Sequence, residues 1–356
     1  MTDVSDLLVR LVQTPSPSGE ERQAAEVLAG WAEAHGLEPE IDDAAVRIIV
    51  EGREPGPTLL MASHLDTVPP GDGWSVPPFD GVVSEGRLTG RGAVDAKASV
   101  SAMTAAAAEL ADHGGPGAGR LVVLATYSEE TRDTSMPRAL KGFGDPPDAA
   151  VVGEPTSLQP CIAQRGQLLL ELHWQGDQVH AGWAAGRQPP PVNAISLAAR
   201  DFNALGSLVL DRKHPLLGAV AVTPTQFEAG VARNVTPPTA WAMLDIRTTP
   251  AYEHAEIVAM IRDRVEARVE IYSDRLVPAE TPADSRLLPA IMAAHPGGVP
   301  FASPTCSDWV FLRHLDAVKL GPGNSRRSHT VDESIELAEV HAAAELYTAL
   351  AREYLR

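Results

Sequence analysis

The chain has 356 residues, more than a usual single domain, so two domains are expected. Its net charge of -18 and isoelectric point near 5.0 argue against nucleic acid or an anionic membrane as a partner, since either would need a basic face. Only Cys161 and Cys306 occur, which excludes a disulfide framework and a thiolate zinc site. The N-terminal stretch resembles neither a secretory signal nor a membrane span, and a cytoplasmic protein is expected.

The first 164 residues predict an α/β sheet. Residues 18–21 (SGEE) have the pattern of a capping box, which would open a helix that Gly36 ends. Apolar strands and one helix of small residues follow in order: strands at 46–51, 57–63, 120–130 and 148–155, and the helix from about 96 to 110. Strands that alternate with helices and end in polar residues indicate an α/β sheet with a site at one edge.

After residue 165 the pattern changes. Apolar and polar residues alternate over 168–174, as in a half-exposed strand. A helix, two strands and a second helix follow, at 191–202, 219–227, 240–248 and 253–269. This β-α-β-β-α-β order predicts a separate antiparallel domain. We expect it at 165–273, inserted into a discontinuous domain of 1–164 and 274–356, which resumes with two helices, a short strand and a closing helix at 334–355.

Residues of the kind that bind metals stand where the predicted strands end. They are His64 and Asp66, Asp95, the pair Glu129 and Glu130, Glu154, and His329. Singly, each has an ordinary interpretation: Asp95 would cap the following helix, and the His64–Asp66 pair is either a ligand with its orienting partner or chance. Because adjacent strand residues point to opposite faces, Glu129 and Glu130 can face one centre only from a bend.

Five motifs together carry a family resemblance. SHLDTVP, GRGAVDAKAS, SEET, VVGEPT and GPGNSRRSHTVDES resemble, in this order, those of the two-zinc aminoacylase and carboxypeptidase family, which includes acetylornithine deacetylase and succinyl-diaminopimelate desuccinylase. The resemblance spans nearly the whole chain. It implies a mixed-sheet, phosphorylase/hydrolase-like catalytic domain with an inserted ferredoxin-like α+β domain that serves as lid and dimerisation domain.

The resemblance also implies roles at a centre of two divalent ions, zinc or cobalt. Asp95 would bridge the ions, with His64 and Glu154 on one and Glu130 and His329 on the other. Asp66 would accept from the His64 ring and fix its tautomer, and Glu129 would be the general base. His180, on the inserted domain, would help to stabilise the oxyanion in the partner subunit's site. The expected substrate-binding residues are Arg165, Asn234, Arg247 and Gly323.

The predicted function is a metal-dependent amidohydrolase that frees the α-amine of a basic amino acid. The GAVDAK motif is most similar to the lysine-biosynthetic branch, so the expected substrates are N-acetyl-lysine, acetylornithine, or lysine or ornithine on an acidic amino-group carrier protein. The alternatives are a succinyl-diaminopimelate desuccinylase, a dipeptidase, or a metal-free binding paralogue. We expect a homodimer through the inserted domain. A carrier protein would need a local basic patch, for which the candidates are Arg187, Arg233, Arg313, Arg326 and Arg327.

Overall fold

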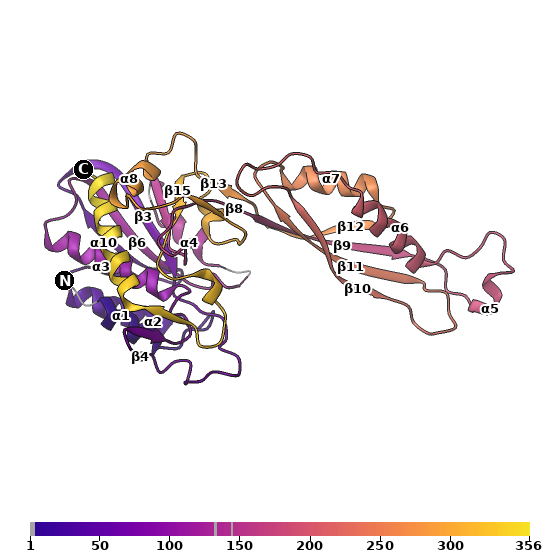
Figure 1. Cartoon of the computed structure of the whole chain (residues 1–356), viewed down its shortest axis with the longest axis horizontal. Coiled ribbons are helices and arrows are strands. Elements are labelled where there is room, and N and C mark those ends of the chain that lie inside the picture. The colour runs from indigo at the N-terminus through magenta and orange to yellow at the C-terminus, as the bar shows by residue number, and fades with distance from the viewer. Residues whose placement is uncertain (1–3, 132–133, 144) are drawn as a thin grey trace. The chain divides into compact units, whose positions relative to one another are not determined.

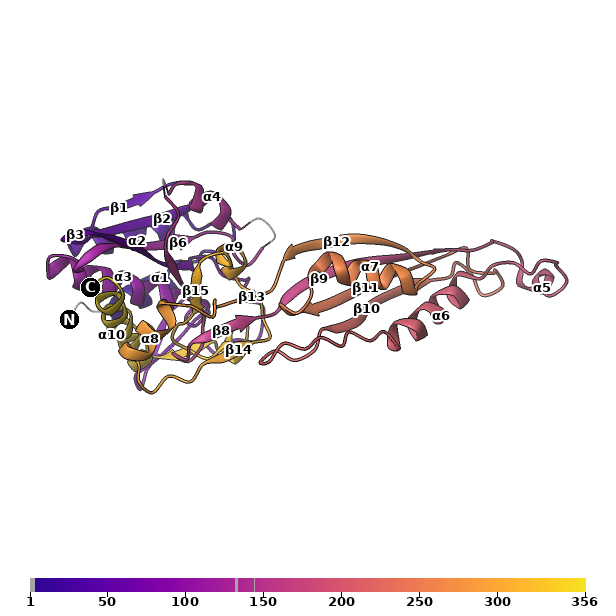
Figure 2. The same ribbon diagram turned by 90° about the horizontal axis from the view of Figure 1, so that it is seen from above.

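The computed structural model describes residues 4–131, 134–143 and 145–356. By its internal contacts the chain divides into two compact units, seen in two views in Figure 1 and Figure 2. Unit 1 consists of Met1–Ile162, Glu280–Phe301 and Ser307–Arg356, and unit 2 of Ala163–Ala279 and Ala302–Cys306. Both units combine helices with sheet, which confirms the mixed α/β class.

Unit 1 is built on a mixed sheet with the order β1-β2-β6-β3-β7-β15-β8-β13, and β14 pairs with β8. The strands are β1 (Pro39–Ile41), β2 (Ala45–Glu51), β3 (Glu54–His64), β6 (Ala118–Thr126), β7 (Ala149–Val152), β8 (Cys161–Gln164), β13 (Ala279–Glu280), β14 (Phe301–Ser303) and β15 (Asp316–Lys319). The central strands β6, β3, β7 and β15 run parallel. Their carboxyl ends therefore meet at one edge of the sheet.

Helices pack on this sheet or on the helices that cover it. They are α1 (Val4–Val12), α2 (Arg22–Ala34), α3 (Lys97–Asp112), α4 (Met136–Lys141), α8 (Leu287–Ala294), α9 (Trp309–Leu312) and α10 (Leu337–Tyr354), with a short 3-10 turn, η1 (Ser325–Arg327). The predicted helix of small residues is α3, which is buried along almost its whole length. It packs on β2, β3 and β6, while α10 packs against α3. Small side chains permit this close approach from both sides.

The closing helix begins later than the sequence predicts. Residues Ser334–Glu336 form the strand β16, which pairs with β5 (Arg87–Thr89) in a small sheet completed by β4 (Val82–Ser84). The helix pattern of this segment is thus overridden at its start by pairing with a strand far away in the chain. In the described part of the chain, no helix is both long and apolar enough to cross a membrane.

Unit 2 is a four-stranded antiparallel sheet with the order β10-β11-β9-β12. Its elements are β9 (Gly166–Gln175), α5 (Ala181–Ala184), α6 (Ala194–Gly206), β10 (Ala221–Ala229), β11 (Thr239–Thr248), α7 (His254–Arg264) and β12 (Arg268–Leu276). Burial alternates along β9 and β11. The inward residues of both strands share one core with α6 and α7. Apart from the one-turn helix α5, the strand and helix order is the one that the sequence predicts.

The predicted capping box at residues 18–21 is wrong. Helix α2 begins at Arg22, and the side chain of its N-cap residue, Glu21, makes no capping hydrogen bond. Ser18 Oγ donates instead to Asp66 Oδ2 at 2.7 Å. Both side chains are directed to partners in the tertiary structure rather than to the helix.

Candidate functional site

The site forms where the parallel strands of unit 1 end. His64 is the last residue of β3, and Asp66 follows it. Glu129 and Glu130 lie just beyond β6, and Glu154 lies two residues beyond β7. The predicted bend between β6 and the two glutamates is present: the strand ends at Thr126, and Ser128 has a left-handed φ of 57°.

Asp95 lies between two histidines. Its Oδ1 is 3.2 Å from His64 Nε2, and its Oδ2 is 3.4 Å from His329 Nε2. His329 comes from the loop after β15, and its Nε2 also lies 2.7 Å from Glu130 Oε1. Each oxygen of one carboxylate therefore faces a different imidazole. The structure thus brings together four of the five expected ligands by direct contact.

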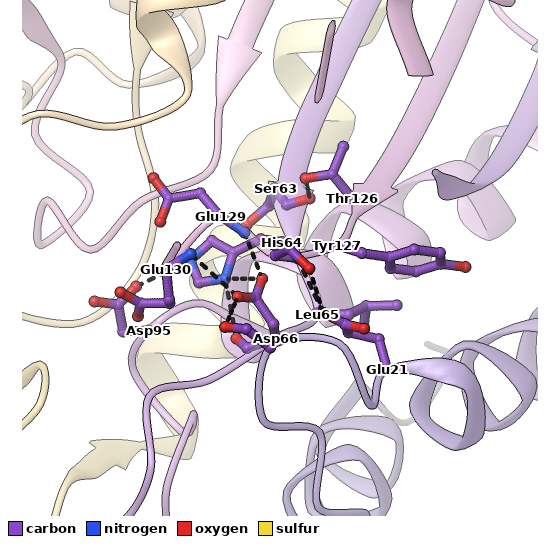
Figure 3. A network of polar contacts seen from close by, with 12 residues as sticks. Glu21, Ser63, His64, Leu65, Asp66, Asp95, Thr126, Tyr127, Glu129 and Glu130 are labelled. Carbon is purple, nitrogen blue, oxygen red and sulfur yellow. Dashed lines mark hydrogen bonds and ion pairs between the residues drawn. The ribbon is translucent and has the colours of Figure 1, made fainter. Parts of the chain in front are cut away.

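Three of these residues offer ligand atoms that lie within 4.8 Å of one another: His64, Asp95 and Glu130. Figure 3 shows Asp95 and Glu130 side by side next to the His64 ring. The fifth expected ligand, Glu154, lies close enough for the charge of Asp95 to act on it. In the part of the chain that the structure describes, a second cluster of this kind lies in unit 2, made by Glu171, His173 and Glu270 on the half-exposed face of the sheet.

Asp66 is completely buried and organises the neighbouring loop. Its Oδ1 accepts from the Glu129 N–H at 3.0 Å, and its Oδ2 accepts from the Glu130 N–H at 3.1 Å. His64 Nδ1 lies 3.0 Å from the main-chain oxygen of Asp66 and 3.3 Å from its Oδ1 (Figure 3). The expected contact with the His64 ring is therefore shared between two oxygens of the same residue.

The acids of the site carry strongly shifted pKa values. Burial raises the pKa of Glu154 to about 8, and the negative charge of Asp95 adds to this shift. Burial also raises the pKa of Glu129 well above its usual range; the charge of Glu154 adds to the shift and His64 opposes it. Carboxyl groups crowded in a buried place resist ionisation until a cation joins them. Glu129 and Glu154 are therefore short of positive charge, whereas for Asp95 burial is outweighed by the hydrogen bonds to His329 and His64, which lower its pKa.

The two histidines are shifted in the opposite sense from ordinary buried imidazoles. Burial alone would lower the pKa of His64, but hydrogen bonds to Asp66 and Asp95 raise it well above its usual range. Hydrogen bonds to Asp95 and Glu130 raise the pKa of His329 to about 10. In the metal-free protein the His329 imidazole is therefore protonated at neutral pH, and the pKa of His64 is shifted in the same direction.

The ion pair that supports Asp95 was not predicted from the sequence. Glu333 is fully buried, and its Oε2 lies 2.5 Å from Nη1 of Arg91, whose side chain is also buried. Glu333 Oε1 accepts from the N–H groups of Val94, at 2.8 Å, and Asp95, at 3.1 Å. The pair thus fixes the main chain that presents the Asp95 carboxylate. Its sequence signal was only an acid four residues after His329, inside the HTVDES motif.

Removal of this buried partner is expected to be costly. We expect Glu333→Ala to lower the free energy of unfolding by about 3–5 kcal/mol, because it leaves the Arg91 guanidinium buried without its carboxylate. Urea denaturation of the metal-free protein would measure this. The matched control is Glu336→Ala, which breaks the exposed pair with Arg87 and should cost less than about 1 kcal/mol. Equal losses in the two variants would contradict the prediction.

The two arginines expected to bind substrate have protein partners within unit 2. The guanidinium of Arg165 donates to the main-chain oxygens of Ala219, Arg247 and Leu217. Arg247 directs Nε and Nη2 to the two carboxylate oxygens of Asp245, at 2.8 and 3.1 Å. Arg165 therefore connects the end of β11 to the segment that precedes β10. In Arg247 one edge of the guanidinium is already used, which leaves Nη1 for a ligand.

The other expected residues divide between the units. His180 and Asn234 are exposed in unit 2 on adjoining chain segments, where the Ala181 N–H donates to the Asn234 main-chain oxygen at 2.8 Å. His180 Nδ1 accepts from the Gly182 N–H at 3.1 Å. Gly323, in unit 1, is buried, and its N–H donates to Glu339 Oε2 at 3.0 Å. That N–H is thus committed to the protein rather than to a substrate.

This fold and site define a class of protein: an α/β enzyme with imidazoles and carboxylates at the ends of its strands. Comparisons with known proteins narrow the class. The model of peptidase family M20/M25/M40 matches residues 60–353. Succinyl-diaminopimelate desuccinylase of Rhizorhabdus wittichii is 33% identical over an alignment of 381 residues that covers 100% of this chain and 99% of the relative.

Solved structures agree with this result at the level of the fold. Aminopeptidase PepT from Bacillus cereus aligns with a TM-score of 0.82 at 21% identity, covering 99% of this chain and 98% of its own. A Bacillus subtilis protein described as a dinuclear metal-binding peptidase from the M20 family aligns with a TM-score of 0.75 at 15% identity, covering 99% and 97%. The chain belongs to peptidase family M20/M25/M40. The predicted enzyme class, a hydrolase of linear amide bonds, is confirmed at this level.

Proposed function

We propose that this chain is a two-metal hydrolase that removes the acyl group from an N-acylated amino acid, with N-succinyl-diaminopimelate as the leading substrate. The main support for this reaction is the position of Asp95, whose two carboxylate oxygens face different histidines. The support for the substrate is the full-length similarity to a succinyl-diaminopimelate desuccinylase. This similarity favours the desuccinylase over the deacetylase that the motifs lead us to expect.

The residues present fit a pair of divalent ions. Imidazole nitrogens and carboxylate oxygens without thiolates suit zinc, and cobalt can use the same donors. Two buried carboxyl groups with raised pKa values, those of Glu129 and Glu154, indicate a site built for added positive charge. His64, Asp95, Glu130, Glu154 and His329 would hold the ions, with Asp95 shared between them.

The metal ions and Glu129 would have different roles in the reaction. Bound divalent ions would polarise the scissile carbonyl and make water acidic enough to give up a proton near neutral pH. Glu129 would take that proton and deliver it to the leaving amine. The carboxylate of Glu129 has no hydrogen-bond or ion-pair partner within the described ranges, whereas that of Glu130 contacts His329. Glu129 is therefore the one of the two that is free to carry a proton.

Metal affinity should rise with pH, because ion binding must displace the proton on His329. In the metal-free protein the pKa of His329 is raised to about 10. Between neutral pH and about 10, each released proton should therefore increase the apparent affinity about tenfold per pH unit. Calorimetric titration with cobalt in buffers of different ionisation enthalpy would count these protons. An affinity that stays constant from pH 7 to 9 would refute the assignment.

The stability of the metal-free protein should change with pH in the opposite direction. A histidine whose folded pKa lies above its unfolded value near 6.5 stabilises the fold fully below that value. This contribution is lost as the pH rises through about 10, the folded pKa of His329. Denaturation midpoints of the chelator-treated protein across this range would measure the loss.

A substrate panel tests the function directly. Protein stripped with chelator should lose amide hydrolysis and regain it with zinc or cobalt. With metal restored, we expect N-succinyl-diaminopimelate to give the highest kcat/KM among N-succinyl-diaminopimelate, N-acetyl-lysine, N-acetyl-ornithine and a simple dipeptide. Hydrolysis that is indifferent to metal would overturn the reaction, and a faster acetylated substrate would overturn the choice of acyl group.

The second candidate is the lysine-biosynthetic hydrolase that the GAVDAK motif favours. A carrier-bound substrate would add an acidic protein partner. All five arginines expected to form a basic patch for it are exposed, Arg187 and Arg233 in unit 2 and Arg313, Arg326 and Arg327 in unit 1. Fast hydrolysis of carrier adducts beside weak hydrolysis of free N-acetyl-lysine would select this candidate.

We also propose that the protein forms a homodimer through unit 2 and is located in the cytoplasm. The molecular mass in solution would test the homodimer.

A further inference from the structure

The turn at residues 18–21 has its own partners at the site. Glu21 is 5% exposed, and its Oε1 accepts from the N–H of Gly19 at 2.8 Å. The same oxygen accepts from the N–H of Ser128 at 3.0 Å and from its hydroxyl at 3.2 Å. A carboxylate that gathers donors from two segments fixes them relative to each other, since hydrogen bonds to a charged acceptor are roughly twice as strong as neutral ones.

Ser128 is the residue that most needs such support. Its φ of 57° lies in the left-handed region, which costs a residue other than glycine about 1–2 kcal/mol. This conformation makes the bend that turns the chain out of β6 and toward the metal-binding residues. The two hydrogen bonds from Ser128 to Glu21 hold the bend in place.

A second connection joins the turn to the other side of the bend. Ser18 Oγ donates to Asp66 Oδ2 at 2.7 Å, and the same oxygen accepts from the Glu130 N–H at 3.1 Å. Asp66 Oδ1 accepts from the Glu129 N–H at 3.0 Å. The turn is therefore connected directly to Ser128 and, through Asp66, to the next two residues.

These contacts determine where Glu129 lies. Its own carboxylate has no partner in the described part of the chain, so the main chain on either side of it sets its position. A misplacement of about 1 Å can cost about 10²-fold in rate. We propose that Ser18 and Glu21 are positioning residues, which hold the Ser128–Glu130 bend so that Glu129 faces the reacting water. This rests on the proposed role of Glu129 as general base.

The first test separates positioning from folding. Glu21→Ala should lower kcat by about 10–10²-fold, with KM changed less than about threefold and two metal ions retained per chain. Glu21→Gln keeps an acceptor oxygen and should restore most of the activity. Glu20→Ala is the matched control, because Glu20 lies in the same turn but is exposed. Glu21→Ala with the kcat of the wild type, or a Glu21→Gln variant as slow as Glu21→Ala, would overturn the proposal.

The second test needs neither metal nor turnover. In the metal-free protein, hydrogen exchange of the Ser128, Glu129 and Glu130 amides should be at least about tenfold faster in Glu21→Ala and in the milder Ser18→Ala than in Glu20→Ala. Amides of β3 serve as the reference for global stability. Unchanged exchange at the bend would overturn the proposal. If the wild-type protein hydrolyses none of the substrates in the panel, the proposed function is wrong. The exchange rates would still show whether Ser18 and Glu21 hold the bend, because their measurement does not depend on activity.

Discussion

Glu129→Gln should lower kcat by about 10²–10⁴-fold while the protein keeps both metal ions, because the amide can no longer take a proton from water. The substitution preserves the size of the side chain, so the half-buried loop need not rearrange. Glu129→Ala should give a similar loss. Metal content by elemental analysis, measured on the same samples as steady-state rates, would separate loss of the base from loss of the ions.

The neighbouring residue provides the control for this experiment. Glu130 Oε1 lies 2.7 Å from His329 Nε2, and Glu130 belongs to the cluster of ligand atoms within 4.8 Å, which does not include Glu129. We therefore expect Glu130→Gln to weaken metal binding first and turnover as a consequence. If instead Glu129→Gln releases metal and Glu130→Gln retains it, the two adjacent glutamates have exchanged roles.

Much of this site could be predicted because its residues follow strands. The carboxyl ends of parallel strands meet at one edge, so His64, the Glu129–Glu130 pair and Glu154 could be placed together from the order of apolar runs. The period of a strand also required a bend before both glutamates could face one centre. The left-handed Ser128 provides that bend.

The supporting residues could not be predicted, because their partners are far away in the chain. Glu21 has the spacing of a capping box, a pattern that spans four residues, yet it binds Ser128, 107 positions away. Glu333 pairs with Arg91 across 242 positions. Local patterns contain no information about such contacts. The return of residues 302–306 to unit 2 is a tertiary feature of the same kind.

Asp95→Ala should release both ions, whereas loss of an outer ligand should weaken one position more than the other. The reason is geometric: one oxygen of Asp95 lies 3.2 Å from His64 and the other 3.4 Å from His329, so a single side chain serves both halves of the site. Because bound metal stabilises the transition state by several kcal/mol, activity should fall by roughly 10³-fold or more. Glu154→Gln is the comparison variant, in which we expect one ion to remain.

The same variant can be checked without metal. The hydrogen bond to Asp95 is the largest cause of the raised pKa of His329, which is about 10. In metal-free Asp95→Ala, the His329 imidazole should therefore titrate at a clearly lower pH. The remaining hydrogen bond to Glu130 should still keep the pKa of His329 above its usual value. Titration followed by nuclear magnetic resonance would give both values. An unchanged His329 pKa, or two ions still bound, would show that Asp95 does not connect the two histidines and would remove the basis for a two-metal centre.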